Sequence, residues 1–126
     1  MVDVSKQIEY WRKSSDEDFA AAQSLLEKGH LRHSLFFAHL ALEKMLKAHV
    51  SRETKDIPPR MHNLVRLAEI AGLSLDSEKA GFLRSFDVYQ MEGRYPDFNQ
   101  LHIDLKNTKD KLTGVEEILL WLKAQL

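Results

Sequence analysis

The chain has 126 residues, of which 44% are hydrophobic and 29% are charged, and its formal net charge at pH 7 is −1. This composition fits one globular domain with a real core, and it excludes a disordered chain, an integral membrane protein and a uniformly basic nucleic-acid coat. The sequence contains no cysteine, which excludes disulfides, thiolate metal sites and a cysteine nucleophile and fits a reducing, intracellular compartment.

The first predicted element is a helix over residues 4–28. Asp3 can cap its start and Gly29 can end it. Its buried face repeats at steps of four and three, and comprises Val4, Ile8, Trp11, Ser15, Phe19, Ala22 and Leu26. The opening residues MVDVSKQIEYW carry charges inside any apolar stretch, so we expect no signal peptide, no membrane segment and a cytoplasmic protein.

A second helix is predicted over residues 31–50, and we expect the rest of the chain to pack against it. Its sequence, LRHSLFFAHLALEKMLKAHV, is apolar around most of its circumference, as is typical of a helix in the middle of a bundle. The main stripe comprises Leu31, Leu35, Ala38, Leu42, Met45 and His49. The remaining narrow polar edge carries Arg32, Glu43, Lys44 and Lys47, and the spacing of Glu43 and Lys47 favours an ion pair. The short link at Gly29 predicts an antiparallel hairpin with the first helix.

The later elements are shorter. Residues 51–60 lose the apolar period and end in two prolines, which predicts a loop. A short third helix can begin at His62 and Asn63 and stop at Gly72. Its predicted inner face comprises Leu64, Leu67, Ala68 and Ala71.

Two further helices complete the prediction. One is capped by Asp76 or Ser77, buries Leu83, Phe86 and Tyr89, and ends near Gly93. The last helix runs from about Asn107, and Gly114 within it indicates the close approach of a neighbouring helix. The buried face of this helix comprises Leu112, Val115, Ile118, Leu119, Leu122 and Leu126. The fold class predicted is all-α, an antiparallel up-and-down four-helix bundle with one short additional helix, as a single domain over residues 1–126.

Several polar residues have competing interpretations. His39 lies beside the apolar stripe, which favours a hydrogen-bonded core or interface histidine over a ligand-binding one. His30 and His33 are three residues apart, but no further residues complete a zinc site, so we predict neither a metal nor a cofactor. Between residues 44 and 66 basic residues outnumber acidic ones, which indicates either cations near a helix C-terminus or an anion-binding patch.

The segment RYPDFNQLH, residues 94–102, has the most distinctive chemistry. In a structural interpretation Arg94 pairs with Asp97, and Pro96 sets the turn. In a catalytic interpretation Arg94 binds a phosphate and His102 accepts a proton from a 2′-hydroxyl, which together suffice for metal-free RNA cleavage. The spacing alone leaves both interpretations open.

Four stretches together resemble the HEPN domain family, in its RYPD-containing branch, over nearly the whole chain. They are Tyr10-Trp11 followed by DEDFAAA at residues 16–22, FFAHLALEKMLKA at residues 36–48, MHNL at residues 61–64, and RYPD at residues 94–97. The resemblance implies a helical bundle that forms a homodimer, with a polar cleft at or near the dimer face. It also implies a small nucleotidyltransferase as partner, within a toxin–antitoxin-like two-component system.

Three functions follow from the residues and the resemblance together. The first is a module that binds a nucleotide, an RNA phosphate or the nucleotidyltransferase through Arg94, Tyr95, Asp97, Glu43 and Lys44, with the arginine on a phosphate and the tyrosine stacked on a base. The second is a metal-independent endoribonuclease that uses Arg94 and His102; seven residues separate the two, which is more than in the ribonuclease branch of the family. The third is a purely structural dimerisation subunit.

Overall fold

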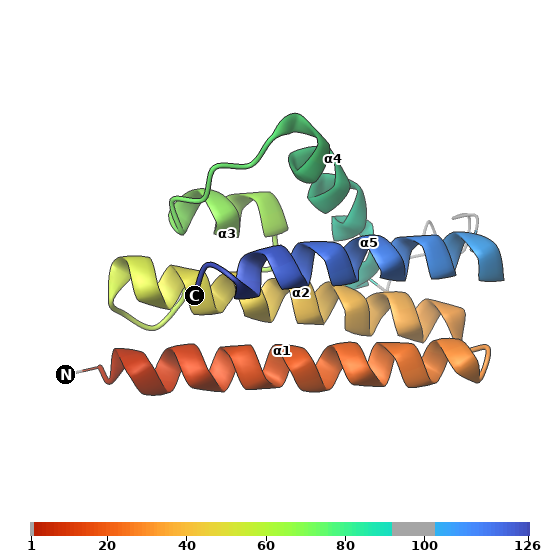
Figure 1. The fold of residues 1–126 in the computed structure, drawn as a ribbon, viewed down its shortest axis with the longest axis horizontal. Coiled ribbons are helices and arrows are strands. Elements are labelled where there is room, and N and C mark those ends of the chain that lie inside the picture. The colour runs from red at the N-terminus through yellow and green to blue at the C-terminus, as the bar shows by residue number, and fades with distance from the viewer. Residues whose placement is uncertain (1, 92–102) are drawn as a thin grey trace.

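The fold is all-α, as the sequence predicts. The computed structural model describes residues 2–91 and 103–126, and within them it contains five α-helices, one 3-10 helix and no strand (Figure 1). The elements are α1 (Val4–Glu27), α2 (Leu31–Thr54), α3 (Leu64–Ile70), α4 (Ser77–Phe86), the 3-10 helix η1 (Asp87–Met91) and α5 (Leu105–Lys123).

The helix α2 lies at the centre of the bundle. It runs antiparallel to α1 after a tight turn at Gly29, whose φ of 79° is the left-handed conformation that glycine adopts easily. α5 packs on both helices and runs opposite to α1, while α3 and α4 lie on the side of the molecule away from α1 (Figure 1). Since α1, α3, η1 and α5 all contact α2, the expectation that the chain packs around this helix is confirmed.

The predicted apolar stripe of α2 forms the core. Leu35, Ala38, Leu42, Met45 and His49 are each at most 1% exposed. Leu83, Phe86 and Tyr89 reach the same core from α4 and η1, and the face predicted for the last helix is buried from Leu112 to Leu122. Periodicity in the sequence therefore located most of the core. Of the face predicted for the first helix only Ser15 and Ala22 are buried, and Leu31 and Leu126 are partly exposed.

Small residues bring α1 and α2 close together. The Ser15 hydroxyl donates a hydrogen bond to the Ala41 carbonyl at 2.6 Å, and the Ser34 hydroxyl donates one to the Ala22 carbonyl at 2.7 Å. All four residues are buried. Each hydroxyl is hydrogen-bonded to the backbone of the facing helix, so neither is left buried without a partner.

Aspartate and asparagine side chains set the helix starts. Asp3, Asn63, Asp76 and Asp104 each accept a hydrogen bond from the backbone N–H three residues later. The caps at Asp3 and Asp76 confirm the predictions. Asp104 caps α5, which begins at Leu105, two residues before the predicted start near Asn107.

Two predicted boundaries were wrong. α2 continues beyond Val50 to Thr54, because Ser51 is still buried and the left-handed Lys55 closes the helix with a hydrogen bond from its backbone N–H to the Ser51 carbonyl at 2.8 Å. The α-helix capped by Asp76 ends at Phe86, and the chain continues as η1, so that the predicted end near Gly93 falls outside the described residues.

The prediction for Gly114 is confirmed. A Cβ atom placed at this residue of α5 would lie 2.7 Å from Cε2 of Phe82, on α4, which is a forbidden distance. A groove of about 370 Å³ runs beside this contact between α4 and α5.

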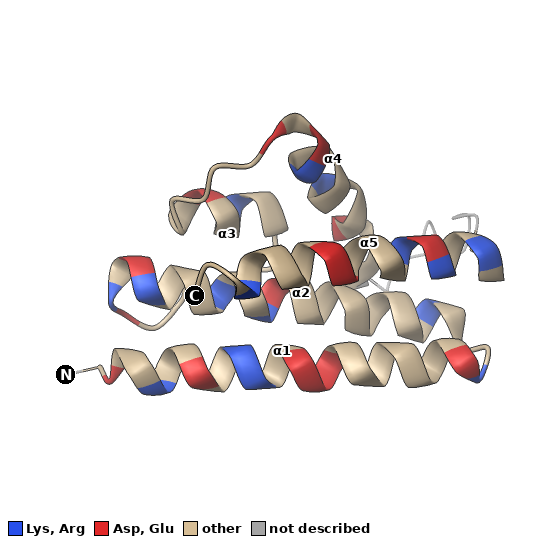
Figure 2. Cartoon of the chain, viewed as in Figure 1, with Lys and Arg blue, Asp and Glu red and all other residues tan. Residues whose placement is uncertain are grey.

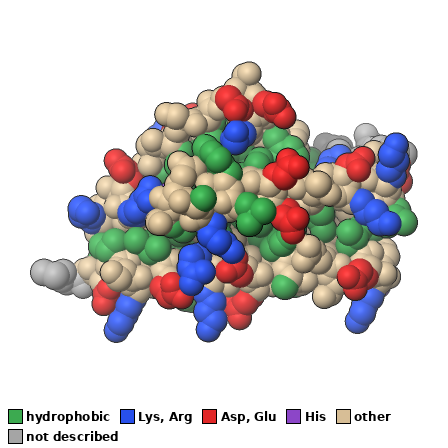
Figure 3. Space-filling view, viewed as in Figure 1, with side chains coloured by type: hydrophobic (Ala, Val, Ile, Leu, Met, Phe, Trp, Pro, Cys, Tyr) green, Lys and Arg blue, Asp and Glu red, His purple; other side chains and the backbone are tan. Residues whose placement is uncertain are grey.

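The surface carries mixed charges. Lys and Arg residues alternate with Asp and Glu along the helices, and in the space-filling view hydrophobic side chains lie between them without merging into one continuous face (Figures 2 and 3). Among the described helices none has the length and apolar character that crossing a membrane requires.

Candidate functional site

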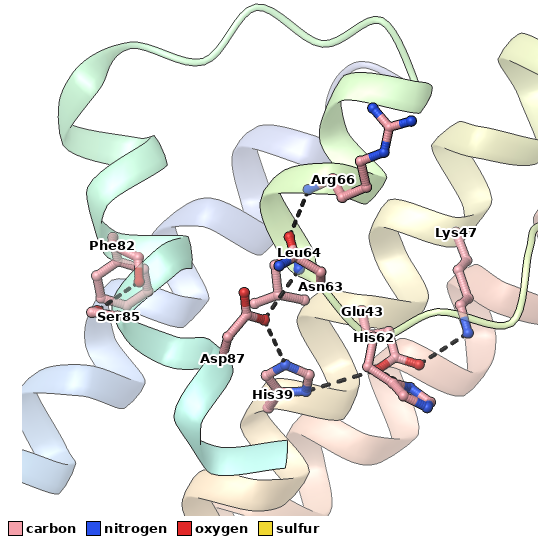
Figure 4. A network of polar contacts seen from close by, with 10 residues as sticks. All are labelled: His39, Glu43, Lys47, His62, Asn63, Leu64, Arg66, Phe82, Ser85 and Asp87. Carbon is pink, nitrogen blue, oxygen red and sulfur yellow. Dashed lines mark hydrogen bonds and ion pairs between the residues drawn. The ribbon is translucent and has the colours of Figure 1, made fainter. Parts of the chain in front are cut away.

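A buried carboxylate forms the centre of the candidate site. Glu43, in the middle of α2, is 4% exposed. Its Oε2 accepts a hydrogen bond from Nζ of Lys47 at 3.0 Å, and its Oε1 lies 3.1 Å from Nδ1 of His62 (Figure 4). A charge in such a place requires partners, because its desolvation is costly.

A buried histidine extends the site toward η1. His39 is fully buried, and its Nε2 lies 3.2 Å from Oδ1 of Asp87, the first residue of η1. The same oxygen of Asp87 accepts a hydrogen bond from the backbone N–H of Leu64 at 3.1 Å. On the other side of the ring, Nδ1 of His39 is 3.8 Å from Oε1 of Glu43, too far for a hydrogen bond.

These five residues, His39, Glu43, Lys47, His62 and Asp87, are called the Glu43 network below. They join the centre of α2 to the loop before α3 and to the start of η1 (Figure 4). Four of the five side chains are at most 18% exposed, but that of His62 is 60% exposed. The network therefore meets the solvent mainly through one imidazole ring.

Lys47 is buried against an aromatic ring. Its side chain is 9% exposed, and its Nζ lies 5.3 Å from the centre of the Trp11 ring on α1. The ring face and the carboxylate of Glu43 together replace the water that the ammonium group loses on burial.

Lys44 points to a different neighbour. Its Nζ lies 2.7 Å from Oδ2 of Asp18 and 2.8 Å from the hydroxyl of Ser14, both on α1. Although adjacent in sequence, Glu43 and Lys44 thus belong to separate groups of contacts.

The structure tests some of the predicted site residues. The ion pair between Glu43 and Lys47 is confirmed, and so is His39 as a hydrogen-bonded core histidine. The polar edge predicted on α2 is buried at Glu43 and Lys47, because the loop before α3 and the ring of Trp11 cover it. The other predicted site residues, Arg94, Tyr95, Asp97 and His102, lie outside the described residues.

Sequence reasoning missed the role of His62. It was interpreted as the start of the third helix, whereas Asn63 caps α3 and His62 turns to Glu43. The only signal was the MHNL stretch, because the contact joins residues nineteen positions apart. In the part of the chain that the structure describes, no group of three or more His, Asp or Glu side chains is arranged to hold a metal ion.

Outside the network, one buried histidine has a perturbed pKa. Burial lowers the pKa of His49 on α2, and the hydrogen bond between its Nε2 and the Leu122 carbonyl, at 2.8 Å, opposes this shift only in part. His49 is therefore a neutral core residue that donates its ring proton to α5.

The protein is an all-α helical bundle with a buried charged network on its central helix. The model of the HEPN domain matches residues 8–125. The chain therefore belongs to the HEPN domain family. No curated protein sequence and no solved structure matches it.

Proposed function

We propose that this HEPN domain protein binds a nucleotide or an RNA phosphate, with Arg94, Tyr95 and Asp97 as the recognising residues. The arginine can hold a phosphate through two parallel hydrogen bonds, and the tyrosine offers a face on which a base can stack. The proposed binding residues on α2 are Glu43 and Lys44, of which Lys44 is paired with Asp18 on α1.

The observation that carries this proposal is the burial of the Glu43 network. Replacing a buried ion pair with apolar residues is often neutral or stabilising, so the network has no evident advantage for packing alone. Asp87 belongs to the network and opens η1, and Arg94 follows the last residue of η1, Met91, by three positions in the sequence. One residue of the buried network, Asp87, thus precedes the RYPD residues by seven positions along the chain.

We further propose a homodimer that works with a small nucleotidyltransferase in a toxin–antitoxin-like two-component system. Membership of the HEPN family and the RYPD stretch support this proposal. Light scattering at micromolar concentration should give the mass of two chains, and the mass of one chain would contradict the dimer.

Binding is tested with oligouridylate that carries a Cy3 label and no terminal phosphate. Arg94→Ala should weaken binding by about tenfold or more, because it removes a charge-assisted contact to phosphate. Arg84→Ala, at an exposed arginine of α4, is the matched control and should bind as the wild type does. Equal binding by wild type and Arg94→Ala, or no binding by any variant, would overturn the proposal.

The same RNA, incubated with EDTA, tests the alternative of a metal-independent endoribonuclease. Cleavage that is lost in both Arg94→Ala and His102→Ala would establish that activity. Binding without cleavage would leave the protein a recognition module.

A further inference from the structure

His62 is held in an unusual position for a surface histidine. One nitrogen, Nδ1, is 3.1 Å from the buried carboxylate of Glu43, while 60% of the side chain is exposed. Because an ionised carboxylate only accepts hydrogen bonds, Nδ1 carries a proton. The other nitrogen, Nε2, is then available to a ligand, and the ring is oriented in advance.

The contacts around His62 do not need it for anchoring. The start of α3 is already fixed by the hydrogen bond from Leu64 N–H to Asp87 and by the Asn63 cap on Arg66 N–H. Glu43 already has an ion pair with Lys47 at 3.0 Å. A histidine that is dispensable to these contacts, yet oriented by a buried carboxylate, has the features of a functional group.

The surrounding charges decide what that group binds. From α2, Lys47 balances Glu43, and His39 lies 3.8 Å from the same carboxylate oxygen. From η1, Asp87 is engaged by His39 and by Leu64 N–H. From α3, Arg66 is paired with Glu69 at 3.1 Å. Since the charges of Glu43 and Arg66 are each balanced by a partner, protonation of His62 places an additional positive charge at the solvent-facing side of the network.

We propose that His62 is a phosphate-contacting residue, which in its protonated form donates Nε2–H to a phosphate oxygen and makes binding dependent on pH. This inference rests on the proposed function, and it names a residue and a form of regulation that the sequence did not indicate. Acid adds a proton and a positive charge to an imidazole, so phosphate binding should strengthen as the pH is lowered.

The test measures binding of the Cy3-labelled oligouridylate at about pH 6 and about pH 8, on either side of histidine titration. Phosphodiesters keep their charge over this range, so the ligand does not contribute to the difference. Wild type should bind about tenfold more tightly at the lower pH, the size of a charge-assisted hydrogen bond to phosphate. His62→Gln should bind as wild type does at the higher pH and lose the gain at the lower one.

Matched variants separate this role from a structural one. His30→Gln replaces an exposed histidine at the N-cap of α2, away from Glu43, and should keep the full pH dependence. If His62→Gln weakened binding equally at both pH values, or left the gain unchanged, the inference would be overturned while the proposed function stood. If wild type failed to bind RNA at either pH, both the inference about His62 and the proposed function would be overturned.

Discussion

The two sides of α2 bury different kinds of polar group. Toward α1 the fully buried polar groups include the hydroxyls of Ser15 and Ser34, and each is satisfied by a backbone carbonyl of the other helix, while the ion pair of Lys44 with Asp18 lies nearer the surface. Toward α3 and η1 the helix buries ionisable side chains around Glu43, which pair with one another except at Nδ1 of His39. The first arrangement lets two helices approach closely, whereas the second creates a charged interior that packing alone does not require.

The difference teaches which side is built for stability and which for chemistry. Small uncharged groups lose little when they leave water and bond to a carbonyl. Ionised groups lose much more, and only their mutual pairing offsets that cost. We therefore expect substitutions on the α3 and η1 side of α2 to destabilise the protein through unbalanced charge. Substitutions on the α1 side should destabilise it through changes in volume.

The largest expected effect is on the charged side. Glu43→Leu should lower the free energy of unfolding by about 3 kcal/mol, because it leaves Lys47 buried without its counter-charge. Denaturation by urea, followed by circular dichroism, measures this loss. The double variant Glu43→Leu/Lys47→Met should recover most of it, since no uncompensated charge from this pair remains. A single variant as stable as wild type would show that water, and not Glu43, compensates Lys47.

A smaller effect is expected on the α1 side, where volume matters. Ala22 is completely buried against α2, so Ala22→Leu should cost about 2 kcal/mol by overpacking. Ala20→Leu, on the exposed side of the same helix, is the matched control and should change stability little. If both variants unfolded at the same urea concentration as wild type, α1 and α2 would not be in close contact.

The smallest effect concerns a histidine with no carboxylate beside it. Burial lowers the pKa of His49 in the folded protein below its ordinary value of about 6.5. The unfolded chain therefore binds more protons between these two values, and stability falls as the pH is lowered below about 6.5. His49→Gln should remove this part of the pH dependence in urea titrations at a series of pH values. An unchanged dependence would mean that another group causes it.

Much of the fold was predictable because its signals are local. Apolar periods located the helices, and Asp3 and Asp76 fixed two of their starts. The end of α2 was not predictable in the same way, because Ser51 is polar yet buried, and its burial depends on distant packing.

The candidate site was less predictable for a related reason. A polar edge such as Glu43 and Lys47 looks the same in sequence whether water or another segment covers it. The partner of Glu43, His62, and the partner of His39, Asp87, lie far along the chain, and only the folded arrangement brings them to α2. Periodicity carries no information about such contacts.

The short turn at Gly29 has a consequence for the order in which the molecule assembles. α1 and α2 meet through contacts that are close in sequence, and such contacts form early. α5 must close a much longer loop before His49 can reach the Leu122 carbonyl. Until α5 docks, an α1–α2 hairpin would expose the apolar side of α2 to water, so this unfinished hairpin is the species most prone to aggregate during folding.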